Sequence, residues 1–222
     1  MNNIDRRSFL RTTAASTAGF WLASQSRMRA ATTPAPQVAL GNTGITMSRV
    51  GQGTGMRGGN RQSNHTRMGF QKLTTLFQHD YDNGITFFDL ADLYGSHIYF
   101  REALRSMPRD KVSILTKLWW RYDGGNASDT PIAFQKRSTQ MALERFRHEI
   151  ATDHLDIVLL HCLGKPDWTT EMEGYMEALS EAKEKKQVRA VGVSCHNLGA
   201  LKTAAELPWV DVILARINSK SA

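Results

Sequence analysis

The chain has 222 residues, of which 41% are apolar and 22% charged, and this composition excludes collagen-like, intrinsically disordered and multi-spanning membrane proteins. Its two cysteines are too few for a small disulfide scaffold, and no pair of Cys-x-x-Cys motifs is present to form a zinc ribbon. Of the formal net charge of +7, residues 1–31 contribute +4, through five arginines and one aspartate, so the remainder carries +3. A charge of that size is ordinary for a protein surface and predicts no nucleic-acid partner.

The first residues carry the features of an export signal. Residues 5–11 (DRRSFLR) resemble the twin-arginine motif, and the weakly apolar stretch 12–23 that follows is shorter than the roughly 20 residues needed to cross a bilayer. This stretch is therefore interpreted as the hydrophobic region of a signal peptide, with a cleavage site near Ala30 or Ala31 and no stable membrane span. We expect a signal peptide over 1–31, a single domain over 32–222, and export to the bacterial periplasm by the twin-arginine machinery.

The segment that follows predicts a hairpin and then six strands. Residues 38–50 contain two short apolar runs on either side of 41–44 (GNTG), a sequence typical of a hairpin turn. Short runs rich in β-branched residues then recur along the chain and end on polar residues. The expected strands are 49–53, 85–89, 112–117, 156–161, 190–194 and 210–216.

Segments with helical periodicity separate these strands. Apolar residues recur at three- and four-residue intervals over 70–81, and 83–84 (NG) supplies a helix stop. Residues 171–186 begin with glutamates and end with lysines, an arrangement that matches the helix dipole. Alternating strands and helices predict an α/β fold of about six βα units around a parallel sheet.

Polar side chains close several of the expected strands. Asp89, Lys117, His161 and Ser194 each stand at a strand end, and Tyr94 follows the second strand. A single histidine or lysine in such a place is more often structural. Because the carboxyl ends of parallel strands form one face, where ligands bind in α/β proteins, four such ends together predict a functional site.

Several motifs resemble those of the aldo-keto reductase family. Residues 88–96 (FDLADLYGS) are similar to its Asp-x-Ala-x-x-Tyr-Gly signature, and 115–117 (LTK), 159–161 (LLH) and 191–194 (VGVS) follow in the same order. The hairpin sequence 40–44 (LGNTG) also resembles that of the family. The resemblance implies a TIM (β/α)8-type barrel that binds NADPH and reduces an aldehyde or ketone to an alcohol.

The same residues can be assigned catalytic roles. Tyr94 is the expected general acid, and the ammonium of Lys117 is expected to favour ionisation of its phenol. Asp89 would keep Lys117 protonated, and His161 would donate a hydrogen bond to the substrate oxygen. By resemblance, Ser194 would hold the nicotinamide carboxamide.

The expected cofactor contacts depart from the family pattern in two places. Cys195 stands where the family commonly has asparagine, and Leu214 where it often has glutamine. Residues 51–56 (GQGTGM) do not form a Rossmann motif, because the third glycine is replaced by methionine. We expect Gly53 to let the backbone approach a ligand, and Ser194 and Cys195 to contact the cofactor.

Alternatives remain for the cysteines and for the chain as a whole. His161-Cys162 and Cys195-His196 contain acceptable zinc ligands, but adjacent strand residues point to opposite faces, so four ligands cannot readily converge; a disulfide between the cysteines is the other possibility. The chain ends after the sixth expected strand, which predicts an incomplete barrel that is not a competent enzyme by itself. A non-catalytic fragment of the same fold is therefore the alternative function. Trp119 and Trp120 either line a substrate mouth or cap the barrel rim.

Overall fold

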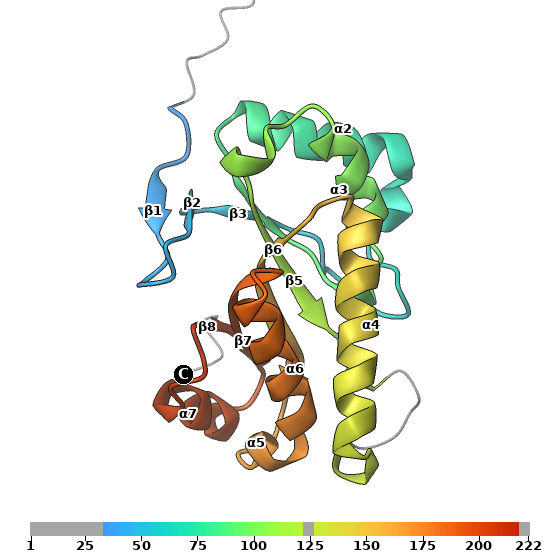
Figure 1. Cartoon of the computed structure of the whole chain (residues 1–222). Coiled ribbons are helices and arrows are strands. Elements are labelled where there is room, and N and C mark those ends of the chain that lie inside the picture. The colour runs from blue at the N-terminus through green and yellow to red at the C-terminus, as the bar shows by residue number, and fades with distance from the viewer. Residues whose placement is uncertain (1–32, 122–126, 218–222) are drawn as a thin grey trace, which may run out of the picture. The chain divides into compact units, whose positions relative to one another are not determined.

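The computed structural model describes residues 33–121 and 127–217 (Figure 1). The chain divides into two units, residues 1–33 and 34–222, and the elements below belong to the second. The expected signal peptide lies outside the described residues. Within the described ranges, no helix has both the length and the apolar character that a membrane crossing requires.

A six-stranded parallel sheet forms the centre of this unit. Its strands lie side by side in chain order, each paired in parallel with the next, as expected for consecutive βα units of an incomplete TIM barrel. They are β3 (Gly51–Gly53), β4 (Phe87–Asp89), β5 (Ser113–Leu118), β6 (Leu155–Leu163), β7 (Val188–Cys195) and β8 (Val212–Ala215). The predicted fold class is therefore confirmed.

The predicted hairpin is also present, and it packs against inward-facing residues of the sheet. Strands β1 (Gln37–Ala39) and β2 (Thr46–Ser48) pair antiparallel, and Gly41 and Gly44 in the turn adopt positive φ angles of 50° and 71°. Ile45 is fully buried in a small cluster with inward-facing residues of β5 to β8: Leu115, Ile157, Leu159, Ala190 and Val212. The hairpin thus contributes to the inner core of the barrel.

Helices cover the outer face of the sheet, and a larger apolar core lies between the two layers. Figure 1 shows the long α4 beside α6, and neighbouring helices contact one another in the order α2, α3, α4, α6. The α-helices are α2 (Phe70–Asp82), α3 (His97–Leu104), α4 (Ile132–Ile150), α5 (Trp168–Glu171), α6 (Glu173–Glu184) and α7 (Leu198–Glu206). Single 3-10 turns are η1 (Thr66–Met68), η2 (Asp92–Tyr94), η3 (Arg109–Lys111) and η4 (Ala127–Asp129).

One predicted helix is interrupted. The expected helix over 171–186 is divided into α5 and α6 at Met172. The buried side chain of Gln135, from α4, donates to the carbonyl of Glu171 at 3.0 Å and accepts from the amide of Gly174 at 2.9 Å. Because this side chain satisfies backbone groups at the break, the interruption depends on a tertiary contact that local periodicity does not reveal.

Candidate active site

The strand register places the predicted polar residues on one face. Parallel pairing sets Asp89 opposite Leu115 and Lys117 opposite Leu159, with Ser194 opposite Leu214. Side chains alternate between the two faces along a strand. Asp89, Lys117, His161 and Ser194 therefore point to the same inner face as the strand residues that pack around Ile45. The structure therefore brings the four strand-end residues to one end of the barrel interior, and Tyr94 follows β4 on the turn η2.

Lys117 is the buried cation of the site. Its side chain is 1% exposed, and Nζ bonds the carboxylate of Asp89 and, at 2.9 Å, the carbonyl oxygen of Leu90. Burial lowers the pKa of Lys117, while the Asp89 carboxylate acts in the opposite direction. The expected pairing of Asp89 with Lys117 is thus present.

The phenol of Tyr94 lies between this ion pair and His161. Its hydroxyl oxygen is 3.2 Å from Nε2 of His161, and Nζ of Lys117 lies 4.9 Å from the centroid of its ring. Lys117 does not bring the ionisation of this phenol into the neutral range: burial, and after it the negative charge of Asp89, raises the pKa of Tyr94 well above the usual value. Tyr94 is therefore a protonated phenol at neutral pH.

His161 is an electrically neutral partner. Burial, together with the positive charges of Lys117 and His196, lowers the pKa of His161 to about 3. Its Nδ1 is buried and has no hydrogen-bond partner among the described residues. The indole Nε1 of Trp120 donates to the His161 carbonyl at 2.9 Å, and the Trp119 ring meets the imidazole at 78°, with centroids 5.7 Å apart. Trp120 thus supports the strand end, and Trp119 lies beside the imidazole.

Ser194 and Cys195 on β7, both expected to contact the cofactor, point to opposite faces of the sheet. The hydroxyl of Ser194 accepts a hydrogen bond from the amide of Cys162 at 2.9 Å and retains its own hydrogen for donation. Cys195 is 1% exposed and belongs to the outer core, where burial raises the pKa of its thiol to about 11. The assignment of Cys195 as a cofactor contact is therefore corrected: it follows Ser194 directly and points to the opposite face.

The cysteines form neither of the alternatives considered from the sequence. Cys162 and Cys195 are both free thiols. Sγ of Cys162 lies 3.9 Å from Nε2 of His196, but Cys195 is on the other face of the sheet. In the ranges 33–121 and 127–217, no group of three or more metal-ligating side chains is assembled.

Two glycines that the sequence did not assign to the site form a wall beside Tyr94. A Cβ atom at Gly55 would lie 2.5 Å from Cζ of Tyr94, and one at Gly58 would lie 2.4 Å from its Cδ1. These glycines therefore admit the tyrosine ring. Gly53, by contrast, has no atom within 4 Å of a Cβ position, and its role toward a ligand stays a prediction.

The inner face fits the nicotinamide end of a cofactor in two respects. Gly53 leaves space at the end of β3, paired with Asp89 on β4. Ser194 offers a hydroxyl hydrogen that can donate to a carboxamide oxygen, whereas Leu214 beside it offers no polar atom. These residues could hold the ring next to Tyr94, Lys117 and His161.

Comparisons with known proteins agree with this geometry. Residues 49–218 match the model of the aldo/keto reductase family. The NADH-specific methylglyoxal reductase of Escherichia coli is 24% identical over 192 residues, which cover 82% of this chain and 59% of the relative. The chain therefore spans less than two thirds of that relative's length.

Solved structures show the same fold. An aldo-keto reductase of Bacillus halodurans in its holo form has a TM-score of 0.63 at 21% identity, over 82% of this chain and 58% of that chain. An aldo-keto reductase of Bombyx mori in complex with NADP has a TM-score of 0.60 at 20% identity, over 84% of this chain and 59% of that chain.

Proposed function

The chain belongs to the aldo/keto reductase family, and on this premise we propose that it reduces an aldehyde or ketone to an alcohol with NADPH as the hydride donor. The observation that carries the proposal is the neutral phenol of Tyr94, 3.2 Å from a neutral His161 and beside the Lys117–Asp89 ion pair. This set places a proton donor, a hydrogen-bonding group and one compensated cation together at the end of the barrel. In a carbonyl reduction these groups can supply the proton, orient the substrate oxygen and stabilise the charge left on the proton donor.

A bound nicotinamide supplies the hydride, and the protein supplies the proton. The carbonyl oxygen would lie between the hydroxyl of Tyr94 and Nε2 of His161, which are now hydrogen-bonded to each other. As negative charge develops on that oxygen, Tyr94 transfers its proton to the more basic alkoxide. His161 orients the oxygen, because an uncharged imidazole can donate one hydrogen bond without competing for the proton.

Lys117 and Asp89 act on the phenolate that remains. The Lys117 ammonium lies over the face of the Tyr94 ring, where it stabilises negative charge as it forms. Asp89 holds Nζ in place, and its carboxylate opposes the lowering of the Lys117 pKa by burial. The ion pair therefore prepares the site for charge that appears only during proton transfer.

The preference for NADPH over NADH is part of the proposal. The relatives point in both directions, since the Escherichia coli protein is named NADH-specific and the Bombyx mori structure contains NADP. We assign Ser194 to the carboxamide and Gly53 to the approach of the ring.

The test is calorimetric titration of the 222-residue chain with NADPH and NADH, followed by cofactor oxidation with a panel of aldehydes and ketones that includes methylglyoxal. We expect NADPH binding and carbonyl-dependent oxidation, whereas the expectation from the sequence, that an incomplete barrel is not a competent enzyme by itself, predicts neither. Absence of binding by either cofactor would overturn the proposal, and tighter binding of NADH would overturn the cofactor preference alone.

The destination of the chain is a separate proposal that rests on residues 5–11, which lie outside the described residues. We propose export to the periplasm through the twin-arginine machinery. A reporter fused after residue 31 should be exported, and the double substitution Arg6→Lys and Arg7→Lys should retain it in the cytoplasm. Export of the double variant would contradict the proposal.

A further inference from the structure

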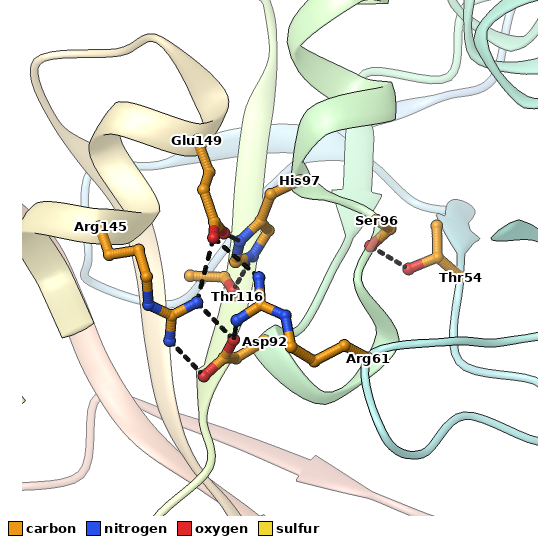
Figure 2. Close-up of polar contacts among 8 residues, drawn as sticks. All are labelled: Thr54, Arg61, Asp92, Ser96, His97, Thr116, Arg145 and Glu149. Atoms are coloured by element: carbon orange, nitrogen blue, oxygen red, sulfur yellow. Dashed lines mark hydrogen bonds and ion pairs between the residues drawn. The ribbon is translucent and has the colours of Figure 1, made fainter. Parts of the chain in front are cut away.

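The turn η2, which carries Tyr94, also contributes Asp92 to a cluster of charged side chains that the proposed reaction does not use; Figure 2 shows this cluster. Its members, here called the ionic cluster, are Arg61, Asp92, Arg145 and Glu149. Asp92 is fully buried and accepts from both Nη atoms of Arg145, at 2.8 and 2.7 Å, and from Nη1 of Arg61 at 3.0 Å. Glu149 accepts from Nη2 of Arg61 at 2.7 Å and from Nη1 of Arg145 at 3.1 Å.

The charges within the cluster balance. Two guanidinium groups face two carboxylates, and His97 Nδ1 lies 2.8 Å from Glu149. Burial would raise the pKa of Glu149, but the contacts with His97 and with the two arginines lower it to about 2. Glu149 is therefore a carboxylate at neutral pH, and it tethers Arg61 to helix α4.

The cluster joins segments that are distant in the sequence. Arg61 comes from the loop 54–62 after β3, Asp92 from the turn η2, and Arg145 and Glu149 from α4. Asp92 begins the turn that Tyr94 ends. An ion pair from Arg61 to Asp92 therefore links the loop to the turn that carries the phenol.

Backbone contact reinforces this link. Gly95, just after Tyr94, has a φ of 66°, and a Cβ atom there would lie 2.1 Å from the carbonyl oxygen of Arg61. The same loop presents Gly55 and Gly58 to the Tyr94 ring, as described above. The loop 54–62 thus forms one wall of the Tyr94 site, to which Lys117 and His161 also contribute.

The loop has a conformation that requires external support. Arg57, Asn60 and Arg61 have φ angles of 49°, 50° and 58°, a region that non-glycine residues adopt only at a cost in free energy. Within the loop, Gly59 and Gln62 exchange two backbone hydrogen bonds of 2.9 Å. Arg61 supplies ion pairs from the loop to the protein body.

We propose that Arg61 and Asp92 are positioning residues whose ion pair holds the loop 54–62 against Tyr94 and so fixes the phenol between Lys117 and His161. The importance of the phenol's position for catalysis rests on the proposed function, whereas the position itself does not depend on that function. Asp92 is the shared anchor, because it also binds Arg145. Arg61 is the better residue to change, since Asp92 then keeps a bidentate partner.

The test follows access to the Tyr94 phenol, and needs neither substrate nor cofactor. Tetranitromethane nitrates ionised, accessible tyrosines, and mass spectrometry of peptides separates Tyr94 from the buried Tyr175, which serves as internal reference. In Arg61→Ala, release of the loop should increase the nitration rate of Tyr94 roughly tenfold, the change that a one-unit fall in the pKa of its phenol alone would produce. Arg61→Lys, which keeps one cation, should restore part of the protection.

The other charged or titratable groups around the phenol are unaltered by this substitution. They come from β4, β5, β6 and the residue after β8, namely Asp89, Lys117, His161, Cys162 and Arg216. Arg105→Ala is the matched control, because it removes an arginine from an exposed ion pair with Glu102 on the surface. That control should leave Tyr94 nitration unchanged.

Gly58→Ala should also displace the loop 54–62 from the Tyr94 ring, without a change in charge. It serves as a second variant in case Arg61→Ala does not fold. Circular dichroism establishes that each variant is folded. Faster nitration of Tyr94 relative to Tyr175 in a folded Arg61→Ala supports the proposal, and faster nitration in Gly58→Ala supports the part of it that packs the loop on the Tyr94 ring. Unchanged nitration in folded Arg61→Ala overturns it, whether or not the chain reduces carbonyls; a chain that binds no nicotinamide would overturn only the proposed function.

Discussion

The hydroxyl of Tyr94 and Nε2 of His161 lie 3.2 Å apart, although the two residues are 67 positions apart in the sequence. Their rings meet edge to face at 82°, with centroids 5.4 Å apart. Because burial keeps the phenol protonated and the imidazole neutral, this pair is uncharged at neutral pH. The adjacent charges of Lys117 and Asp89 compensate each other. A substrate oxygen that enters here would meet an intact proton donor.

The first prediction concerns pH. The donor must be protonated, and its raised pKa places its ionisation above the ordinary tyrosine value of about 10. His161, with a pKa lowered to about 3, stays neutral throughout the neutral range. We therefore expect kcat for carbonyl reduction to show no break near about 6.5, the ordinary histidine value. A break there that disappears in His161→Gln would show that His161 titrates during catalysis.

The second prediction concerns the proton donor. Tyr94→Phe removes the hydroxyl while keeping the ring that fills the space beside Gly55 and Gly58. Loss of a positioned general acid should lower kcat by about 10² to 10⁴, with little change in cofactor Kd. Tyr81→Phe, on the outer helix α2, is the matched control and should keep normal turnover. Near-normal turnover of Tyr94→Phe would assign the acid to another residue.

The third prediction concerns the buried ion pair. Lys117→Met removes a cation that is 1% exposed and leaves the Asp89 carboxylate without its partner. Breaking a buried pair typically costs about 3–5 kcal/mol in the free energy of unfolding, and the partial exposure of Asp89 favours the lower value. Urea unfolding should show this loss, and the double variant with Asp89→Asn should recover part of it. A strictly additive double variant would show that the pair is not energetically coupled.

The fourth prediction concerns Glu149, whose pKa is lowered from 4.5 to about 2. A carboxyl with a lowered folded-state pKa stabilises the protein above the pKa of the unfolded chain. That stability is lost as the pH falls through the folded-state pKa. The wild-type advantage over Glu149→Gln should be largest at neutral pH and should fall by about 3 kcal/mol in total as the pH is lowered, mostly between about pH 5 and 2.

Urea unfolding at stepped pH measures this difference for Glu149. Glu102→Gln, which alters an exposed pair with Arg105, is the control and should show little such dependence. A constant difference between wild type and Glu149→Gln across the acid range would show that the carboxylate of Glu149 is not preferentially stabilised in the folded state.

The residues on the inner face of the site could be predicted from the sequence, because inward-facing side chains recur at every second position along a strand. Asp89, Lys117, His161 and Ser194 stand at strand ends with matched parity, so a period of two residues was sufficient to bring them together. The same rule shows why Cys195 was misassigned, since the residue next to Ser194 must point to the outer core. The family motif placed Tyr94, but it did not indicate which residues enclose it.

What the sequence did not predict depends on contacts between distant segments. The break at Met172 requires Gln135 from another helix, and the pKa of Tyr94 depends on burial that only the assembled barrel creates. Nothing in the sequence indicated that Gly55 makes room for the Tyr94 ring, because that contact joins the loop after β3 to the turn after β4. Local pattern therefore located the chemical groups, and tertiary packing determined their protonation and their enclosure.

The final prediction separates two glycines that are close in the sequence. Gly53→Ala places a methyl group where no atom lies within 4 Å, so the free energy of unfolding should change by less than about 0.5 kcal/mol. Gly55→Ala places a methyl group 2.5 Å from Cζ of Tyr94, and the ring or the loop must move. Overpacking of this kind typically costs about 1–3 kcal/mol.

Thermal or urea unfolding measures both effects, and cofactor titration distinguishes the two roles. If Gly53 faces the nicotinamide, Gly53→Ala should weaken cofactor binding in a protein of normal stability, because its methyl group would occupy the space that the ring requires. Gly55→Ala should instead lower stability and kcat, since it displaces the proton donor. Normal cofactor affinity in Gly53→Ala would remove Gly53 from the cofactor site, and normal stability and kcat in Gly55→Ala would contradict the close packing of the loop on Tyr94.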